Sequence, residues 1–395
     1  MPRSELKRFF KESIILATVF IVAPFVCFFI YVRKFFKKNG EPRKILIIDN
    51  AKIGDLVCAT PVFRAIKQKY PDCYLTVLVT PRVEGILRNN PHIDELIVKS
   101  LNEKKGFGDL FNLVKKIRKS NFDASINLTP GTLNFILPFL AVIPERISTV
   151  NDNFGYFYKS LARLATRRVI FKKNSLSVRH YLELLKHINI ADQNLKKEVY
   201  FTDLAGKKAA DFLSENGIMP QDTIVGFCLT AGNKIKEWGE ENYAHLADEI
   251  LKNYGFKIVA IGGPQDEAVL RKFGQLCGVS VIITYNDFLL EEIPALIKKF
   301  FYFVSSDTGP LYIANALDMP VLDILGPCSD LDQPPVYERC GAINVKNLEC
   351  WPCSTVIKPA TFCTQGHLKC LKEMSVEMVM EGFDKLVKKY PVADK

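Results

Sequence analysis

Four short segments of the chain combine small residues with carboxylate, hydroxyl or ammonium side chains, and each follows an apolar run. Two kinds of chemistry would suit them. A carboxylate can take the proton from a hydroxyl nucleophile, and lysines with free backbone N–H groups can hold a diphosphate. The candidate residues are Asp55 after Ile45–Ile48, Thr230 and Lys236 after Ile224–Leu229, Gln265 after Lys257–Ile261, and Asp307, Thr308 and Gly309 after Tyr302–Val304.

Asp55 belongs to the segment Ile45–Pro61, ILIIDNAKIGDLVCATP, in which an aliphatic run meets a glycine turn. The unbroken run is typical of a strand that is covered on both faces. A helix begins either directly after the turn or at Thr60-Pro61. Asp55 should therefore lie at the carboxyl end of a strand, where open α/β sheets bind ligands. Its carboxylate could act as a general base, or it could only stabilise the start of the helix.

The segment Thr230–Trp238, TAGNKIKEW, has small residues at Ala231 and Gly232 that let a ligand approach the backbone. Lys236 and a second lysine supply the positive charge that a diphosphate requires. A solvated loop is the alternative interpretation of the same residues.

Gly262-Gly263-Pro264 comes directly before Gln265 and two acidic residues. This combination suits the recognition of a ribose or a base, because vicinal hydroxyl groups need acceptors. A plain strand-to-helix turn would use the same glycines.

The segment Ser305–Ala316, SSDTGPLYIANA, is typical of a helix that starts beside a ligand. Asp307 or Thr308 can cap the helix, Gly309 leaves room, and the following proline suits the first helical turn. The N–H groups at this helix start would then point toward an anion. Helix capping alone would account for the same residues.

Four cysteines between residues 350 and 370 have the spacing C-x2-C-x9-C-x6-C; they are Cys350, Cys353, Cys363 and Cys370. Four thiols suit a structural zinc ion or an iron–sulfur cluster. Unpaired or redox-active thiols are one alternative. Disulfide bonds are another, favoured only outside a reducing compartment.

The rest of the chain from residue 41 onward alternates short apolar runs with helical patterns, which predicts two α/β units with parallel sheets. This alternation stops between Asn151 and Lys197, where the sequence is rich in aromatic and basic residues and has a helical pattern. It restarts at Ile224. We therefore expect a domain boundary near 195–205, with Rossmann-like domains over residues 41–200 and 201–395 that face each other across a cleft.

The N-terminal segment 1–40 has a different composition. An uncharged run covers residues 13–32, which is long enough for a helix to cross about 30 Å of hydrocarbon. Of the formal net charge of +10, +7 lies in residues 1–44, so the globular part is nearly neutral and nucleic acid is not an expected partner. More basic residues follow the run than precede it. This weakly favours a single-pass anchor with a cytoplasmic body.

Taken together, these motifs resemble glycosyltransferase family nine, the heptosyltransferases of lipopolysaccharide core synthesis. The resemblance covers about residues 43–390 and rests on KILIIDNAKIGDLVCATPVFRAIKQKYP, NNPHIDELI, TAGNKIKEWGEENYAHLADEI, VAIGGPQDE, VSSDTGPLYIANALDMPVLDILGP and the C-terminal cysteine segment. It implies a GT-B fold, inverting transfer without a catalytic metal, and ADP-heptose as the usual donor.

The resemblance also implies roles for single residues. Asp55 falls on the family's general base, and Lys236 falls on the lysine that holds the donor diphosphate. Asp307, Thr308 and Gly309 fall on the segment that meets the phosphates and the sugar, and Gln265 falls near the position that contacts adenosine. The chain departs from the family at Cys228–Gly232, where the family usually has His-Pro-Gly-Ala-Gly.

The hypothesis that follows is an inverting sugar transferase at the cytoplasmic face of the inner membrane. It would move a heptose or a related sugar from ADP-heptose or another nucleotide sugar to a hydroxyl of a lipid-linked saccharide such as the lipopolysaccharide core. The alternatives are a nucleotide-sugar hydrolase or epimerase, and a non-catalytic, membrane-anchored scaffold that binds nucleotides.

Overall fold

The computed structural model describes residues 3–36, 40–99, 107–152, 154–172, 174–336, 339–356 and 358–392. Each of the predicted segments 1–40, 41–200, 201–395 and 350–370 also contains a few residues that are not among those described, and predictions for these residues lie outside the described part of the chain.

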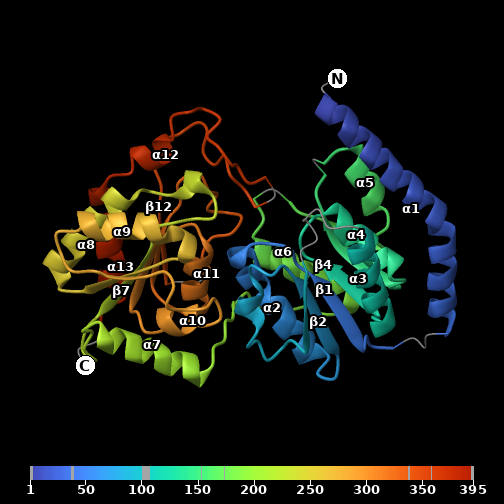
Figure 1. Cartoon of the computed structure of the whole chain (residues 1–395), viewed down its shortest axis with the longest axis horizontal. Coiled ribbons are helices and arrows are strands. Elements are labelled where there is room, and N and C mark those ends of the chain that lie inside the picture. Colours follow the sequence, from blue (N-terminus) through green and yellow to red (C-terminus); the bar gives the residue numbers. More distant parts are fainter. Residues whose placement is uncertain are drawn as a thin grey trace.

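Two parallel six-stranded sheets organise the described chain, one in each half (Figure 1). The first has the order β3-β2-β1-β4-β5-β6 and the second the order β12-β11-β10-β7-β8-β9. The strands are β1 (Lys44–Ile48), β2 (Tyr74–Val79), β3 (Glu95–Val98), β4 (Ala124–Asn127), β5 (Glu145–Val150), β6 (Arg167–Ile170), β7 (Ile224–Cys228), β8 (Lys257–Ile261), β9 (Ile282–Thr284), β10 (Tyr302–Ser306), β11 (Val321–Ile324) and β12 (Cys340–Ile343). The predicted pair of α/β units with parallel sheets is confirmed.

Each half has the strand order of a doubly wound Rossmann fold, in which the order reverses once. The reversal falls between β1 and β4 in the first half and between β7 and β10 in the second. Open α/β sheets bind ligands at this switch point, outside the carboxyl ends of the strands. The loops after β1, β4, β7 and β10 are therefore the positions where a site is expected.

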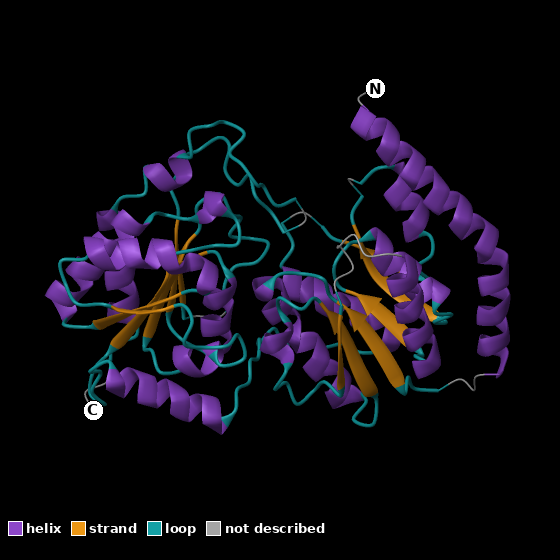
Figure 2. Cartoon of the chain, in the orientation of Figure 1, coloured by secondary structure: helices purple, strands orange, loops and turns teal. Residues whose placement is uncertain are grey.

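Helices cover both faces of each sheet (Figure 2). The α-helices are α1 (Arg3–Phe36), α2 (Ile53–Lys69), α3 (Phe107–Ser120), α4 (Thr132–Leu140), α5 (Tyr156–Ala162), α6 (Ser177–Leu184), α7 (Asp203–Glu215), α8 (Glu240–Tyr254), α9 (Glu267–Leu276), α10 (Ile293–Ile297), α11 (Gly309–Ala316), α12 (Lys369–Lys372) and α13 (Val376–Lys389). Short 3-10 helices occupy Glu84–Leu87, Leu185–Ile188, Lys234–Lys236 and Pro264–Asp266.

The start of α2 decides between the two possibilities left open by the sequence. The helix begins at Ile53, directly after the glycine turn, and Pro61 lies inside it. A proline has no N–H group for the carbonyl one turn earlier. The Thr60 hydroxyl donates instead to the Val57 carbonyl oxygen at 2.8 Å, so that this acceptor is satisfied.

The structure corrects the sequence interpretation at one strand. Arg167–Ile170, which lies in the segment expected to be helical, forms the edge strand β6. Strand β6 is four residues long and largely exposed, so its sequence lacks the apolar run that marks a buried strand.

The two halves share one hydrophobic cluster. Buried residues of β1, α2 and α6 in the first half are continuous with buried residues of α7, α10 and α11 in the second. The closest approach is between the N-terminal ends of α2 and α11. A Cβ atom on Gly54 would lie 2.7 Å from the Tyr312 ring, and a Cβ atom on Gly309 would lie 2.8 Å from Ile53. Glycine at both positions allows this contact between the halves.

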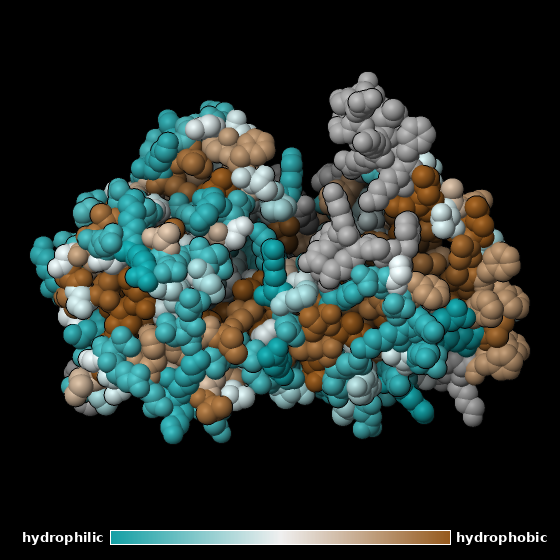
Figure 3. All heavy atoms as spheres, in the orientation of Figure 1, coloured by the Kyte–Doolittle hydropathy of each residue, from teal (hydrophilic) through white to brown (hydrophobic). Residues whose placement is uncertain are grey.

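Helix α1 lies along the outer side of the first half, next to α4 and α5 (Figure 1). One side of it packs on that half through residues such as Val26 and Ile30. The Arg33 guanidinium donates to the Phe122 carbonyl oxygen at 2.8 Å, and Lys34 pairs with Glu145. The outward side of α1 is apolar and exposed, which gives the molecule a brown edge in Figure 3. Residues 12–36 are long and apolar enough to cross a membrane by length and composition.

The contact between α2 and α11 predicts the effect of a single methyl group. Substitution Gly54→Ala should destabilise the chain by about 1–3 kcal/mol, because the Cβ atom overpacks the Tyr312 ring. The matched control is Gly108→Ala in α3, where a Cβ atom meets no heavy atom within 4 Å. Thermal unfolding of both variants in detergent measures the difference. Equal midpoints would contradict the described packing.

Candidate functional site

Asp55 lies in the first turn of α2, on the side of the first half that faces the second. The Lys52 N–H group donates to Asp55 Oδ2 at 3.4 Å, so the carboxylate does help to cap the helix. The Gln333 side chain, which comes from the second half, donates to the Cys58 thiol of α2 at 3.3 Å and lowers the pKa of the Asp55 carboxyl group. Asp55 is thus at the boundary between the halves, and it is only partly exposed.

Lys236 and Asp307 form an ion pair within the second half. Lys236 Nζ lies 2.7 Å from Asp307 Oδ2 and 3.4 Å from the Asp307 carbonyl oxygen. The Tyr312 hydroxyl donates to the other oxygen of the Asp307 carboxylate. Lys236 follows β7 and Asp307 follows β10, so the pair joins the two loops at the switch point of this sheet.

The surroundings of Asp55 make it a stronger base than an ordinary aspartate. Burial raises the pKa of its carboxyl group, and the negative charge of Asp307 also raises it. The Lys52 N–H group, the Gln333 side chain and the positive charge of Lys236 lower it, but the net pKa stays above its usual value. Tyr312 links the two sides, because its ring packs at Gly54 and its hydroxyl donates to Asp307, so Asp55 and the ion pair face the same boundary between the halves.

The ion pair stays charged at neutral pH. Burial by itself lowers the pKa of Lys236, but Asp307 more than offsets this, and the net pKa is raised. Burial likewise raises the pKa of Asp307, but Lys236 reverses the effect and the net pKa is lowered. The site therefore holds a fixed positive charge that can face an anion.

Thr308 and Gly309 lie at the start of α11, as the N-cap residue and the first helical residue. They are close to the ion pair and, through Gly309, to Ile53 of the first half. Thr230 is buried at the end of β7, where its carbonyl oxygen accepts from the Cys228 thiol. These residues surround the same switch point.

Gln265 is less closely connected to this group. It is exposed in the short helix Pro264–Asp266 after β8, and its side chain donates to Asp266 Oδ2 at 3.2 Å. Among the described residues, no hydrogen bond joins it to Asp55, Lys236 or Asp307. Gln265 follows β8. This strand neighbours β7 on the side away from the switch point.

Four residues near the site were not found from the sequence: Gln333, Tyr312, Cys328 and Lys197. Gln333 lowers the pKa of Asp55, and the Tyr312 hydroxyl donates to Asp307. The buried Cys328 thiol is near enough to the ion pair for the charges of Asp307 and Lys236 to affect its pKa. Lys197 is buried between the halves, where its Nζ lies 2.8 Å from Asn315 Oδ1 and 5.0 Å from the centre of the Tyr312 ring. Only Tyr312 belongs to a segment that the sequence had marked.

The four cysteines between residues 350 and 370 lie in one neighbourhood, because their charges affect one another. All four are free thiols. Among the described residues, no three His, Cys, Asp or Glu side chains are arranged to hold a metal ion. The described residues thus show no arrangement for the structural zinc ion or iron–sulfur cluster that the spacing predicts.

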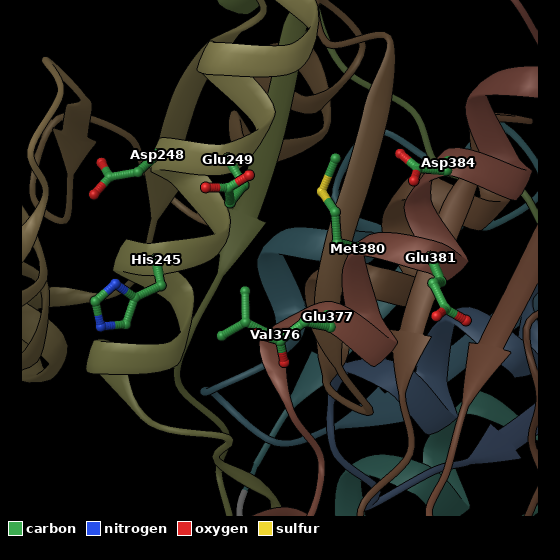
Figure 4. A pocket seen from close by; sticks show the side chains of 8 residues that line it. All are labelled: His245, Asp248, Glu249, Val376, Glu377, Met380, Glu381 and Asp384. Atoms are coloured by element: carbon green, nitrogen blue, oxygen red, sulfur yellow. The ribbon is translucent and has the colours of Figure 1, made fainter.

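A cavity of about 750 Å³ lies between α8 and α13 (Figure 4). It is lined by His245, Asp248, Glu249, Val376, Glu377, Met380, Glu381 and Asp384. None of the predicted site residues lines it. Its carboxylates would repel a nucleotide diphosphate, so the candidate site remains the one between the halves.

Asp55 of one half and the Lys236–Asp307 ion pair of the other lie where the two Rossmann-like halves face each other. Two Rossmann-like halves that face each other in this way define the GT-B class of glycosyltransferases. The comparisons agree with this class. The family model for glycosyltransferase family 9 (heptosyltransferase) matches residues 110–361. The chain belongs to this family.

Individual relatives and solved structures support the same family and fold. Lipopolysaccharide heptosyltransferase 2 of Salmonella typhimurium is 25% identical over 314 residues, which are 76% of this chain and 88% of the relative. A family 9 glycosyltransferase structure from Veillonella parvula has a TM-score of 0.75 at 20% identity and covers 89% of this chain and 99% of its own. The structure of ADP-heptose lipopolysaccharide heptosyltransferase II from E. coli has a TM-score of 0.70 at 18% identity and covers 88% and 100%. The predicted GT-B fold is confirmed.

The effect of the nearby Gln333 side chain on the pKa of Asp55 predicts a change in the pH dependence of activity. Gln333→Leu removes an interaction that lowers the pKa of Asp55, so this pKa should rise further. A general base works when deprotonated, and the acidic limb of kcat/KM should therefore move to higher pH. The exposed Gln221 supplies the control Gln221→Leu. An unchanged acidic limb in Gln333→Leu would show that Asp55 is not the titrating base.

Proposed function

We propose that this member of glycosyltransferase family 9 transfers a heptose or a related sugar from ADP-heptose to a hydroxyl of a lipopolysaccharide core or another lipid-linked saccharide. The observation that carries the proposal is the electrostatic contact between Asp55 of one half and the Lys236–Asp307 pair of the other. The names of the relatives supply the sugar and the acceptor class.

In this proposal the donor diphosphate binds to Lys236 and to the N-terminal end of α11. Lys236 has three ammonium protons and uses its ion pair with Asp307 for orientation, so it can still donate to phosphate oxygens. Thr308 and Gly309 add hydroxyl and backbone donors at the helix start. Thr230 lines the same switch point, and Gln265 is assigned to the nucleoside end.

The chemical step is a single displacement at the anomeric carbon. The acceptor oxygen forms a bond to that carbon as the bond to the diphosphate oxygen breaks, and ADP leaves with the bonding electrons. Asp55 takes the hydroxyl proton of the acceptor during the attack. Attack on the face opposite the leaving group inverts the configuration. Lys236 and the α11 N–H groups stabilise the charge on the leaving diphosphate, so no divalent cation is required.

The domain roles follow from this mechanism. Residues 41–200 would supply the base and the acceptor side, and residues 201–395 would bind the nucleotide sugar. Segment 1–40 would anchor the enzyme in the inner membrane through a single pass over residues 13–32, with the body in the cytoplasm. Anchoring next to a lipid-linked acceptor raises the effective concentration of the two partners.

Asp55→Asn tests the assignment of the base. The amide keeps the shape of the side chain but accepts no proton, so transfer should fall by a factor of about 10² to 10⁴. The affinity for ADP, measured by calorimetry, should stay within twofold of the wild type. Asp72→Asn is the control, because Asp72 is an exposed aspartate outside the site. Normal transfer by Asp55→Asn would exclude the mechanism.

The same preparation separates the enzyme from the alternatives. A hydrolase or epimerase would consume ADP-heptose equally well without an acceptor. A scaffold would bind nucleotide and turn over nothing. Transfer that depends on a deacylated core acceptor is the expected result.

A metal-removal experiment tests the proposed metal independence and the cysteine segment together. Transfer should survive treatment with a chelator, because in this proposal Lys236 and the α11 N–H groups stabilise the leaving group without a metal cation. Zinc and iron are measured in the same anaerobically purified chain and in Cys350→Ser. Metal that is bound to the wild type and lost from the variant would support the site that the spacing predicts. Absence of both metals would remove it.

A further inference from the structure

A segment of the second half reaches the first half close to Asp55. Residues 328–336, which we call the strap, follow β11. The Asp332 carbonyl oxygen in the strap accepts two hydrogen bonds from Ser177, one from its N–H group and one from its hydroxyl, both at 2.8 Å. Ser177 is the first residue of α6 in the first half, and it is fully buried. The strap is therefore tied to the first half by a buried contact.

Helix α11 holds the strap from the second half. Asn315 Nδ2 donates to the Val336 carbonyl oxygen at 2.8 Å, and the Val336 N–H group donates to Asn315 Oδ1 at 3.3 Å. About one turn earlier in α11, the Tyr312 hydroxyl lies 2.6 Å from the Gln333 carbonyl oxygen. The strap is thus held from both halves, by α6 on one side and by α11 on the other.

The Gln333 side chain lies next to the turn of α2 that carries Asp55. Gln333 Nε2 donates to Cys58 Sγ at 3.3 Å. Asp55 and Cys58 are three residues apart in α2, so their side chains are neighbours on one face of the helix. Tyr312 gives a second contact, because its ring meets Gly54 and its hydroxyl meets the Gln333 backbone. Two independent contacts therefore place Gln333 beside Asp55.

From these contacts we infer that the strap is a positioning element of the site, which holds the Gln333 amide beside Asp55. Ser177 and Asn315 are then positioning residues that act through the strap. Among the described residues, no hydrogen bond joins Ser177 to Asp55, so any effect of Ser177 on the base must pass through other groups. The inference rests on the proposed function, and it adds residues that control the state of its base.

The strap should act on the protonation of Asp55. Burial raises the pKa of Asp55, and the Gln333 side chain opposes this rise. A displaced strap should therefore raise the pKa further, and the acidic limb of kcat/KM should move to higher pH, because a general base works when deprotonated. The variants below keep the other titratable groups around Asp55, which are Asp49, Lys52, Cys58, Tyr181, Lys236 and Asp307.

Ser177→Ala tests the inference without touching the reacting groups. It removes the hydroxyl bond to Asp332 and keeps the N–H bond, so the strap should loosen while the fold persists. The control is Ser375→Ala in the second half, which removes the N-cap of α13, where Ser375 Oγ accepts from the Met378 N–H group. This control also loses one serine hydrogen bond at a helix start, but it leaves the strap intact.

Ser329→Ala loosens the strap from within. Ser329 Oγ accepts from the Leu331 N–H group at 3.1 Å, so this variant breaks a bond inside the strap and none to the first half. It should act in the same direction as Ser177→Ala, and the test therefore does not depend on one variant.

The acidic limb of kcat/KM, measured on the full-length chain in detergent, should move to higher pH in Ser177→Ala. On that limb kcat/KM should fall by about two- to tenfold, which is the effect of one neutral hydrogen bond. In a Gln333→Leu background the same substitution should add no further shift, because the strap then carries no amide to position. Ser375→Ala should leave the limb unchanged.

Alkylation of Cys58 by iodoacetamide reports on the strap without turnover. Peptide mass spectrometry compares its rate with that of Cys73, a buried thiol of the same half. The rate at Cys58 should rise by about two- to tenfold in Ser177→Ala, because Gln333 then holds this thiol less firmly. Ser375→Ala should not change it.

An acidic limb that stays in place in both Ser177→Ala and Ser329→Ala would overturn the inference. An equal shift in the wild-type and Gln333→Leu backgrounds would also overturn it, and so would unchanged alkylation of Cys58. Faster alkylation in a chain that shows no transfer at all would support the strap but contradict the proposed function. Because alkylation needs no substrate, the two failures are distinguishable.

Discussion

The contact between the N-terminal ends of α2 and α11 is the constraint on which the rest of the site depends. Gly54 faces the Tyr312 ring, and Gly309 faces Ile53, so each helix start presents a glycine to a side chain of the other half. Side chains at these two positions would force the helices apart. Asp55 comes directly after Gly54, and Asp307 lies two residues before Gly309. The close packing of the helices therefore brings Asp55, the proposed base, toward the Asp307 loop of the other half.

Charges and hydrogen bonds then set the state of each group at this contact. Tyr312 joins the packing to the chemistry, because its ring meets Gly54 and its hydroxyl donates to Asp307. Asp307 in turn holds Lys236 in its charged form. Burial leaves Asp55 with a raised pKa, which favours proton transfer from a hydroxyl. One arrangement thus places the proposed base on one side and a charged lysine on the other.

Much of this could be predicted from the sequence, because the chemistry follows strands with clear apolar runs. Asp55, Lys236 and Asp307 each come soon after such a run, and the runs form β1, β7 and β10 at the two switch points. The resemblance to family 9 then assigned an expected role to each of these segments. Strand β6 was missed because it is short, exposed and begins with two arginines. Gln333 was missed because it lies in a segment without periodicity, and only tertiary folding brings it to Asp55. The cysteine spacing indicated a cluster, but spacing does not fix the geometry that a metal ion requires.

The account is tested most directly by a crystal structure of the full chain with a non-transferable ADP-heptose analogue. It predicts that the diphosphate lies against Lys236 and the start of α11, with the anomeric carbon facing Asp55 across a space that fits one acceptor hydroxyl. A diphosphate bound away from Lys236, or an Asp55 carboxylate turned away from the sugar in the closed complex, would contradict it.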